Sequence, residues 1–189
     1  MQNDFFTRIL LLTVLILPIA MLSPAFADSH LKQGGTLIFG RGGDSVGLDP
    51  ALEEDGESFK VCDNIYDTLI EYKDDSAEIE PGLAASWESS EDGLIWTFHL
   101  RRGVTFHDGT PFNAEAVLFS LNRQHDETHP FHKVGGSYIY WIATGLAEIV
   151  DTITAVDEFT VQIRLKTAYA PFIYTIAITP FSIVSPTAV

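Results

Sequence analysis

The chain has 189 residues, a formal net charge of −15 at pH 7 and 46% hydrophobic residues. A protein this acidic is not expected to bind nucleic acid or an anionic membrane surface, because both would repel it. The hydrophobic content is enough for a packed core, and the length suits about one ordinary domain.

Residues 1–27 are predicted to form a secretory signal peptide. Arg8 supplies the positive charge, residues 9–22 form an apolar run, and residues 25–27 read Ala-Phe-Ala, with small residues where signal peptidase cleaves. We expect cleavage after Ala27, export to the periplasm, and no stable membrane insertion of residues 28–189 afterwards. The one cysteine, Cys62, cannot form an internal disulfide and is expected to be a small buried apolar residue.

The first half of the exported part predicts a strand, a loop, a helix and a strand in turn. Residues 34–43 are a short apolar run between glycine pairs, typical of a strand. The segment DSVGLDP at 44–50 predicts a tight loop in which the backbone of Gly47 and Leu48 can approach a ligand closely. Apolar residues at helical spacing predict a helix over 58–70, and LIEYK predicts a strand over 69–73.

Turn signals divide the next part of the chain. Asp92-Gly93 predicts a hairpin, because the glycine accepts a positive φ, and residues 94–99 alternate with the period of a strand. Asp108-Gly109 predicts a second tight turn. Trp87, Trp96 and Phe98 are expected in the core rather than on a ligand surface.

The last part predicts a helix, a hairpin and a short helix. Asn113 is the expected N-cap of a helix that ends near His125, since Pro130 forbids a regular continuation. Residues 148–165 predict two strands around a turn at 157–158, and residues 171–178 a short helix. The fold class is therefore α/β in the mixed α+β sense, with prominent antiparallel hairpins. Because the last residues, FSIVSPTAV, are apolar, we expect the chain to be a piece of a longer protein.

The segment WESSEDGLIWTFHLRRGVTFHDGTPFNAEAVLFS, residues 87–120, resembles the signature of the family 5 extracellular solute-binding proteins, the periplasmic components of ABC importers for peptides, nickel and related solutes. GGTLIFG, GLDP, PGLAASWE and VDEFTVQIRL are also similar to that family. HPFHKVGGSYIYW and the following GLAEIV resemble its dipeptide-binding branch most. One departure is Ala116, where the family usually has an acidic residue that can complete a capping box.

The resemblance implies a two-lobe periplasmic binding protein, type II and class C-like at full length. Residues 28–189 would then be the N-terminal part of lobe I, a mixed sheet with hairpins, truncated before the second lobe. The groups that hold a dipeptide's termini in the family, an Asp for the ammonium and an Arg for the carboxylate, would lie beyond Val189.

The stretch HDETHPFHKVGGSYIYW, residues 125–141, supports two interpretations. His125 and His129 are four residues apart and His132 could add a third metal ligand, but Pro130 disturbs the helical geometry that such a site needs. Solvated loop histidines are the simpler interpretation, so we expect no dedicated metal site. His99 and His107 are expected to be structural.

The second half of that stretch favours a ligand pocket. The glycines at 135–136 allow a sharp turn, and Tyr138 and Tyr140 offer flat apolar surface with polar tips. Alternation would place both tyrosines on the same face of a strand. Trp141 is expected in the core. The candidate ligand-binding residues are Gly47, Leu48, Tyr138 and Tyr140.

These features predict a binding protein, not an enzyme, with no cofactor. Its expected partners are a short peptide, most simply a dipeptide, and an inner-membrane ABC permease, and it is expected to be a monomer at full length. A nickel, metal-chelate or haem receptor of the same fold is the main alternative, and a secreted hydrolase a weaker one. Turn and cap chemistry explain Asp108 and Glu115 without acid–base catalysis. The sequence contains no H-E-x-x-H and no P-loop.

Overall fold

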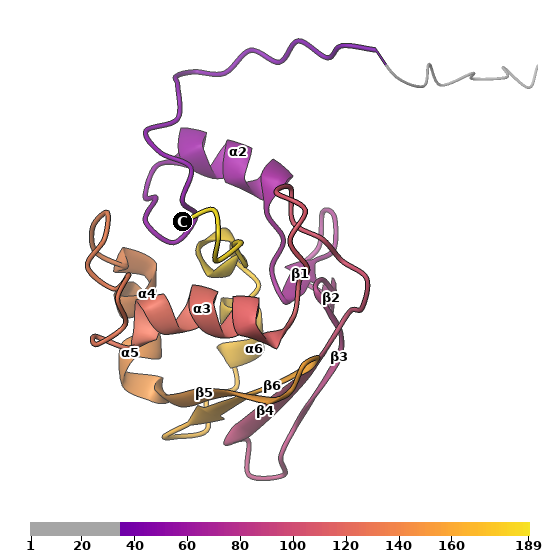
Figure 1. The fold of residues 1–189 in the computed structure, drawn as a ribbon, viewed down its shortest axis with the longest axis vertical. Coiled ribbons are helices and arrows are strands. Elements are labelled where there is room, and N and C mark those ends of the chain that lie inside the picture. The colour runs from indigo at the N-terminus through magenta and orange to yellow at the C-terminus, as the bar shows by residue number, and fades with distance from the viewer. Residues whose placement is uncertain (1–34) are drawn as a thin grey trace, which may run out of the picture. The chain divides into compact units, whose positions relative to one another are not determined.

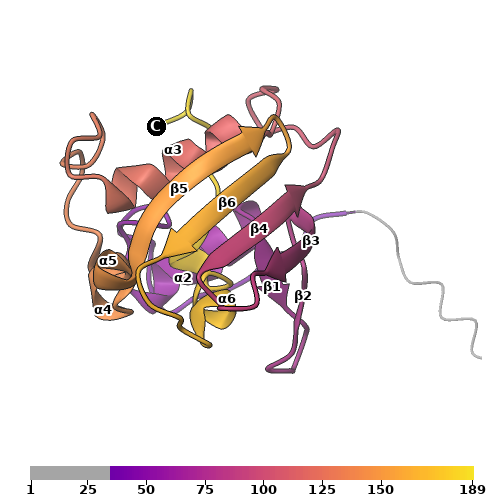
Figure 2. The same ribbon diagram turned by 90° about the horizontal axis from the view of Figure 1, so that it is seen from below.

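A four-stranded antiparallel sheet with strand order β3-β4-β6-β5 organises residues 41–189 (Figure 2). The computed structural model describes residues 35–189, so the predicted signal peptide lies outside the described residues. Residues 41–189 form a compact unit of their own. The strands of the sheet are β3 (Ala84–Ser89), β4 (Ile95–Leu100), β5 (Val150–Asp157) and β6 (Thr160–Leu165).

Both predicted hairpins are confirmed. Gly93 turns between β3 and β4 with a φ of 69°, and β5 and β6 pair across the turn that follows Asp157. β4 and β6 pair with each other at the middle of the sheet, where Phe98 lies opposite Val161. The two hairpins thus join through their second strands, and the buried residues of β4 and β6 share one face.

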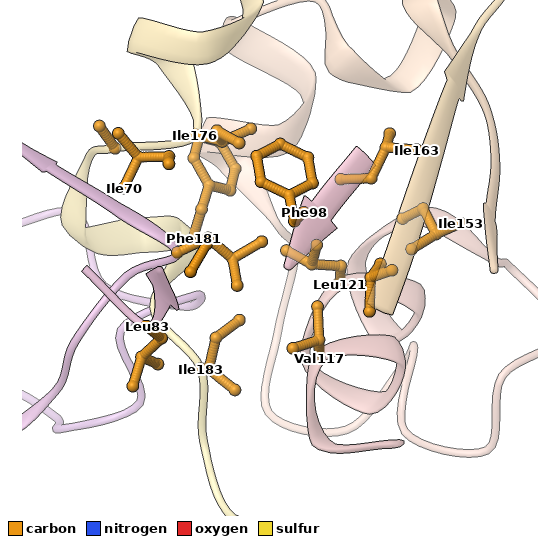
Figure 3. Packing of buried hydrophobic residues seen from close by; sticks show 14 of the residues in the cluster. Ile70, Leu83, Phe98, Val117, Leu121, Ile153, Ile163, Ile176, Phe181 and Ile183 are labelled. Atoms are coloured by element: carbon orange, nitrogen blue, oxygen red, sulfur yellow. The ribbon is translucent and has the colours of Figure 1, made fainter. Parts of the chain in front are cut away.

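Helix α3 (Ala114–His125) packs against β5 and β6 (Figure 1). As predicted, Asn113 caps it, because its side-chain oxygen accepts from the backbone N–H of Ala116 at 3.3 Å. Val117 and Leu121 are buried on its inner face. Figure 3 shows the cluster that they form with residues from the sheet and from the end of the chain: Ile70, Leu83, Phe98, Ile153, Ile163, Ile176, Phe181 and Ile183.

The remaining elements are short. They are α2 (Gly56–Ile65), β1 (Ile70–Tyr72), β2 (Ile79–Pro81), α4 (Ile139–Ala143), α5 (Leu146–Ile149), α6 (Phe172–Thr175) and the 3-10 helix η1 (Thr179–Phe181). β1 and β2 form a separate two-stranded sheet. The described part of the chain contains no helix that is long and apolar enough to cross a membrane.

Two predicted elements are wrong in part. Residues 35–43 form no strand, and Leu37, Ile38 and Phe39 remain exposed. A strand depends on hydrogen bonds to a neighbour, and no strand in residues 35–189 pairs with this segment. The predicted helix over 58–70 begins at Gly56 and ends at Ile65.

The early end of α2 has a tertiary cause. The chain leaves the helix at Tyr66, whose backbone is extended, and the carbonyls of Asp67, Thr68 and Leu69 then accept hydrogen bonds from Ile183, Leu83 and Ala84, respectively. Pairing with distant segments overrides the helical spacing of the side chains. The predicted helix over 171–178 forms only in part. α6 covers Phe172–Thr175, and the 3-10 helix η1 follows it.

The core predictions hold. Phe98, Trp141 and Cys62 are buried, and Trp87 and Trp96 are half-buried against the core. Burial, together with nearby carboxylates, raises the pKa of the Cys62 thiol to about 11, so the thiol stays protonated and unreactive. The mixed α/β class is confirmed.

Candidate functional site

The loop that carries Gly47 and Leu48 is held in place by α2. Ser58 in the first turn of α2 accepts a hydrogen bond from the N–H of Val46 at 2.9 Å. Asp55 caps the helix and accepts from the N–H groups of Glu57 and Ser58. Ser58 also accepts from the N–H of Gly47 at 3.4 Å, so α2 fixes the backbone of the loop at Val46 and Gly47.

Gly47 and Leu48 differ in their surroundings. A Cβ atom on Gly47 would lie 2.1 Å from Oε1 of Glu53, so a side chain here would have to displace that buried carboxylate. Leu48 is 45% exposed and lines a cavity. The structure thus places Leu48, of the two, where its side chain can meet a ligand.

Next to Leu48, Asp49 forms a bidentate ion pair with Arg123 in the last turn of α3. Nη1 and Nη2 of Arg123 each lie 2.6 Å from a carboxylate oxygen of Asp49. Arg123 is only 1% exposed, and the rings of Phe119 and Tyr138 lie 5.9 Å from its guanidinium carbon. The arginine is thus neutralised by the loop and covered by aromatic faces, which is the arrangement that a buried guanidinium requires.

The same arginine orders the histidine-rich loop through its backbone. Its carbonyl oxygen lies 2.9 Å from Nδ1 of His132, and the ring of His132 packs at a tilt against Tyr138, with ring centroids 5.6 Å apart. Tyr138 donates from its hydroxyl to the carbonyl oxygen of Phe131 at 2.9 Å. Burial raises the pKa of the Tyr138 phenol, so the phenol keeps the proton that it donates.

The three histidines do not converge. His125 contacts the carbonyl oxygen of Asp151, His129 accepts from the N–H of Phe131, and His132 contacts Arg123. Within residues 35–189 no group of three or more His, Cys, Asp or Glu side chains is arranged to hold a metal ion.

The glycine pair brings the histidine-rich loop against the Leu48 loop. Gly135 has a φ of 88°, and a Cβ atom there would lie 2.5 Å from Cδ1 of Leu52. Leu52 belongs to the turn that starts at Asp49, whose carbonyl oxygen accepts its N–H at 3.0 Å. Two segments distant in sequence, 47–53 and 131–138, therefore meet around Arg123.

The two tyrosines are not on a strand, and the expectation of a shared face is wrong. Tyr138 precedes α4 and Tyr140 lies within it, so their side chains diverge, because a helix turns by about 100° per residue. Tyr138 is buried and lines a small cavity. Tyr140 packs edge-to-face on Phe59 of α2, with ring centroids 5.5 Å apart. Only Tyr138 of the two belongs to the cluster around Arg123.

The larger cavity has a volume of about 640 Å³ and opens beside Leu48. Its lining is mainly apolar, and comes from the loop at 48–49, the end of α2, the turn at 104–108 and residues 183–189. Its few polar groups include His107 and Asp108, both exposed turn residues. A mostly apolar hollow with a few polar groups is typical of a small-molecule site.

Asp108 fixes one wall of this cavity. Its carboxylate accepts from the hydroxyls of Thr110, Ser185 and Thr187, at 2.6, 2.5 and 2.6 Å. These bonds hold the pKa of Asp108 well below its usual range, so the anchor persists wherever the carboxylate is ionised. The turn predicted at Asp108-Gly109 therefore also anchors the segment at 185–187.

Residues 43–47 read Gly-Asp-Ser-Val-Gly, the letters of the G-x-S-x-G motif of hydrolases. That motif needs its serine between a strand and a helix, hydrogen-bonded to a histidine. No strand precedes Ser45 within the described residues 35–44, and its hydroxyl lies instead 3.1 Å from a guanidinium nitrogen of Arg41 and 3.4 Å from the carbonyl oxygen of Glu57. The hydroxyl of Ser45 therefore helps to order its own loop.

The sequence model described as bacterial extracellular solute-binding proteins, family 5 Middle, matches residues 78–188. The chain belongs to this family. The match includes β2 to β6, α3 and most of the lining of the larger cavity, whereas Gly47, Leu48 and Asp49 precede it.

Named relatives bind different solutes. The chain is 40% identical over 161 residues to the dipeptide-binding protein of Escherichia coli, covering 81% of this chain and 30% of the relative. It is 38% identical over 171 residues to heme-binding protein A of Haemophilus influenzae, covering 86% of this chain and 31% of the relative. The chain thus spans about a third of the length of these relatives.

Solved structures agree with the fold. The periplasmic binding protein DppA of Helicobacter pylori, in complex with the peptide STSA, matches with a TM-score of 0.71 and 41% identity, over 77% of this chain and 30% of that one. The dipeptide binding protein of Pseudoalteromonas, in complex with Met-Leu, matches with a TM-score of 0.73 and 28% identity, over 77% and 30% of the two chains.

Sequence reasoning missed Asp49 and Arg123. Asp49 was interpreted only as part of an Asp-Pro turn, and its partner is 74 positions away. A signal was present in α3. Arg123 lies on the side of the helix that includes Ala116 and Ser120, both buried. A cation on a buried helix face needs a carboxylate partner, although spacing could not tell which of the chain's carboxylates would provide it.

Replacement of Asp49 by Ala is expected to destabilise the fold by about 3 kcal/mol, because the buried guanidinium of Arg123 loses its counter-ion. The double variant Asp49→Ala with Arg123→Met should recover much of the loss, since Met can pack against Phe119 and Tyr138. Urea unfolding monitored by circular dichroism measures both. The control is Lys60→Ala, which breaks the exposed pair with Glu57 and should cost less than about 1 kcal/mol. Equal losses for Asp49→Ala and Lys60→Ala would contradict the account.

Gly135→Ala and Gly109→Ala form a matched pair. Both glycines have a positive φ, of 88° and 83°, but a Cβ atom on Gly109 would meet nothing within 4 Å. Both variants carry the same backbone penalty, and only Gly135→Ala must also displace Leu52. We expect Gly135→Ala to lower the free energy of unfolding by about 1 kcal/mol more than Gly109→Ala. Equal effects in the same urea titration would show that the two loops are not in contact.

Proposed function

We propose that the chain is the N-terminal part of lobe I of a periplasmic solute-binding protein that delivers short peptides, most simply dipeptides, to an inner-membrane ABC permease. The observation that carries the proposal is the 40% identity to a dipeptide-binding protein over most of the chain. Structural relatives in complex with a peptide, at 41% and 28% identity, support the same ligand class. The family is one of solute-binding proteins, which supports binding rather than catalysis.

The geometry suits a ligand that is read through its main chain. The loop at 46–49 is ordered by Ser58 and by Arg123, yet Leu48 remains exposed beside the larger cavity. Gly47 leaves room for the buried carboxylate of Glu53, which a side chain at this position would displace. Fixed backbone groups next to a mainly apolar hollow can bind a peptide main chain while tolerating different side chains.

We propose the candidate residues in two groups. Leu48 would contact the peptide directly at the larger cavity, with Gly47 next to it in the same loop. Tyr138 would act from the other side of Arg123, where it lines the smaller cavity, and Tyr140 would support it by packing on Phe59. The peptide's charged termini would be held by residues beyond Val189.

The proposed mechanism is closure of two lobes. Residues 1–27 would direct export and be removed, and residues 28–189 would provide one face of the cleft in a monomeric protein. A ligand that is contacted by both lobes only in the closed form shifts the open–closed population towards closure. Contact with one lobe alone gives weak binding, so the chain by itself should hold a dipeptide only at millimolar concentrations.

A haem or metal-chelate receptor is the second candidate. One relative is named heme-binding protein A, and a structural relative, NikA of Brucella suis, at 27% identity, was solved in complex with Fe(III)-EDTA. His125, His129 and His132 would then provide the ligands. Each of these rings is turned to a different backbone group, so the loop would have to rearrange. A secreted hydrolase is a weaker alternative, because within residues 35–189 the hydroxyl of Ser45 bonds to Arg41 and Glu57 and to no histidine.

Chemical-shift mapping of the ¹⁵N-labelled chain tests the proposal, with the dipeptide Ala-Leu, haem and Ni²⁺ as parallel probes. We expect Ala-Leu at millimolar concentrations to shift the amide signals of Gly47 and Leu48, and Leu48→Ser to weaken this response. Val46→Ser is the control, because Val46 is 86% exposed in the same loop but lines no cavity.

Three outcomes would overturn the proposal: no shift with Ala-Leu, shifts that Val46→Ser weakens as much as Leu48→Ser, or micromolar binding of haem or Ni²⁺ that is lost when His125, His129 and His132 are replaced. A micromolar Ala-Leu complex with residues 28–189, measured by calorimetry, would contradict the division of the site between two lobes.

A further inference from the structure

Glu53 is a buried carboxylate beside the loop that carries Gly47 and Leu48. It follows the turn that starts at Asp49, and it is only 8% exposed. A Cβ atom on Gly47 would lie 2.1 Å from its Oε1 and 3.5 Å from its Oε2, so Oε1 lies against the backbone of Gly47. Burial raises the pKa of the Cys62 thiol in α2, and among the charged groups Glu53 contributes most to that rise. The carboxylate is thus close to both the loop and α2.

The carboxylate of Glu53 has no partner within residues 35–189. In this range no arginine, lysine or histidine forms an ion pair with it, and no N–H or O–H group donates to it. The fully enclosed polar atoms without a partner include oxygens of Asp55 and Glu57 but neither oxygen of Glu53, so this carboxylate can still be reached from solvent. An unpaired buried charge costs free energy, and a cation that reaches Glu53 would recover it.

The nearby cations already bind other carboxylates. Arg123 binds Asp49, and Lys60 binds Glu57. The chain as a whole has a net charge of −15, so Glu53 adds an uncompensated negative charge to an acidic protein. A cationic group from solution is therefore attracted to this carboxylate.

The geometry favours a compact cation. A planar guanidinium binds both oxygens of a carboxylate side by side, and Oε1 of Glu53 is hindered because it lies against Gly47. A primary ammonium is a compact point charge that needs only one accessible oxygen. A metal ion would need further ligands, and residues 35–189 contain no group of three His, Cys, Asp or Glu side chains that could hold one.

We propose that Glu53 binds a primary ammonium group of the solute beside Gly47 and Leu48. This role deepens the proposed function and rests on it, because it names a chemical group that the solute carries. The peptide's own termini are assigned to residues beyond Val189, so Glu53 holds a second ammonium, that of a lysine side chain. The mainly apolar cavity beside Leu48 suits the four-carbon stem of that side chain. The protein therefore prefers peptides that contain lysine.

Two peptides that differ by one ammonium group test the site on the full ¹³C,¹⁵N-labelled chain: Lys-Leu and norleucyl-leucine. Both have the same charged termini, so a difference between them reports the side-chain ammonium. The readouts are the carboxyl carbon signal of Glu53 and the amide signal of Gly47. Butylammonium and 1-butanol repeat the comparison without a peptide, so the ammonium site is tested even if no dipeptide binds.

Lys-Leu should bind at least about tenfold more tightly than norleucyl-leucine, the effect of one charged hydrogen bond, and butylammonium more tightly than 1-butanol. Glu53→Gln should remove both differences, and Glu54→Gln, which changes the adjacent exposed carboxylate, should keep them. Equal binding within each pair, or equal effects of the two variants, would overturn the proposal. Equal binding of the two peptides would leave the proposed function standing. Failure of every dipeptide would overturn that function, while a saturable response of Glu53 to butylammonium would still support the ammonium site.

Urea unfolding without ligand gives an independent test. Glu53→Gln should raise the free energy of unfolding, because it removes a buried charge that has no partner in the described residues. Glu54→Gln should leave the free energy of unfolding unchanged, since that side chain is exposed. A loss of stability in Glu53→Gln would show that another part of the chain already neutralises Glu53, and would overturn the proposal.

Discussion

The ion pair between Asp49 and Arg123 is the constraint on which the functional face of this protein depends. Arg123 is almost fully buried, and a guanidinium cannot remain there without a carboxylate. Both carboxylate oxygens of Asp49 bind the guanidinium, and this contact fixes the loop in which Leu48 is exposed. The backbone carbonyl of the same arginine contacts His132, so one residue of α3 orders two loops that are distant in sequence.

This arrangement explains the histidine-rich segment without a metal. His132 contacts Arg123, and the glycine at 135 lets the loop approach Leu52. The aromatic residues that follow close over the arginine and form the wall of the smaller cavity. Two separate hollows border these loops. The larger one is mainly apolar and opens beside Leu48, and the smaller one lies at the C-terminal end of α3.

Local signals made much of the fold predictable. Asp92-Gly93, Asn113 and the alternation at 94–99 act through neighbours in sequence, and each gave the correct element. The errors arose where contacts with segments distant in sequence determine the local structure. α2 ends early because the backbone becomes extended at Tyr66 and residues 67–69 pair with segments distant in sequence, and the strand expected at 34–43 finds no partner in the described chain. In the site, Leu48 was expected from its tight loop and Tyr138 from its aromatic character, but the arginine that brings their loops together could not be predicted. Its partner lies 74 positions away, and spacing carries no information about that contact.

Native-state hydrogen exchange in Arg123→Met tests the central claim most directly. The amides to follow are those of Leu52 and His132, one in each loop, with those of β4 and β6 as an internal reference. If the ion pair holds the Asp49 loop, Leu52 should lose protection, while the two central strands keep theirs. His132 should also keep most of its protection, because its partner is the backbone carbonyl at position 123, which the substitution leaves in place. Unchanged protection of Leu52, or equal losses at Leu52 and His132, would contradict the account.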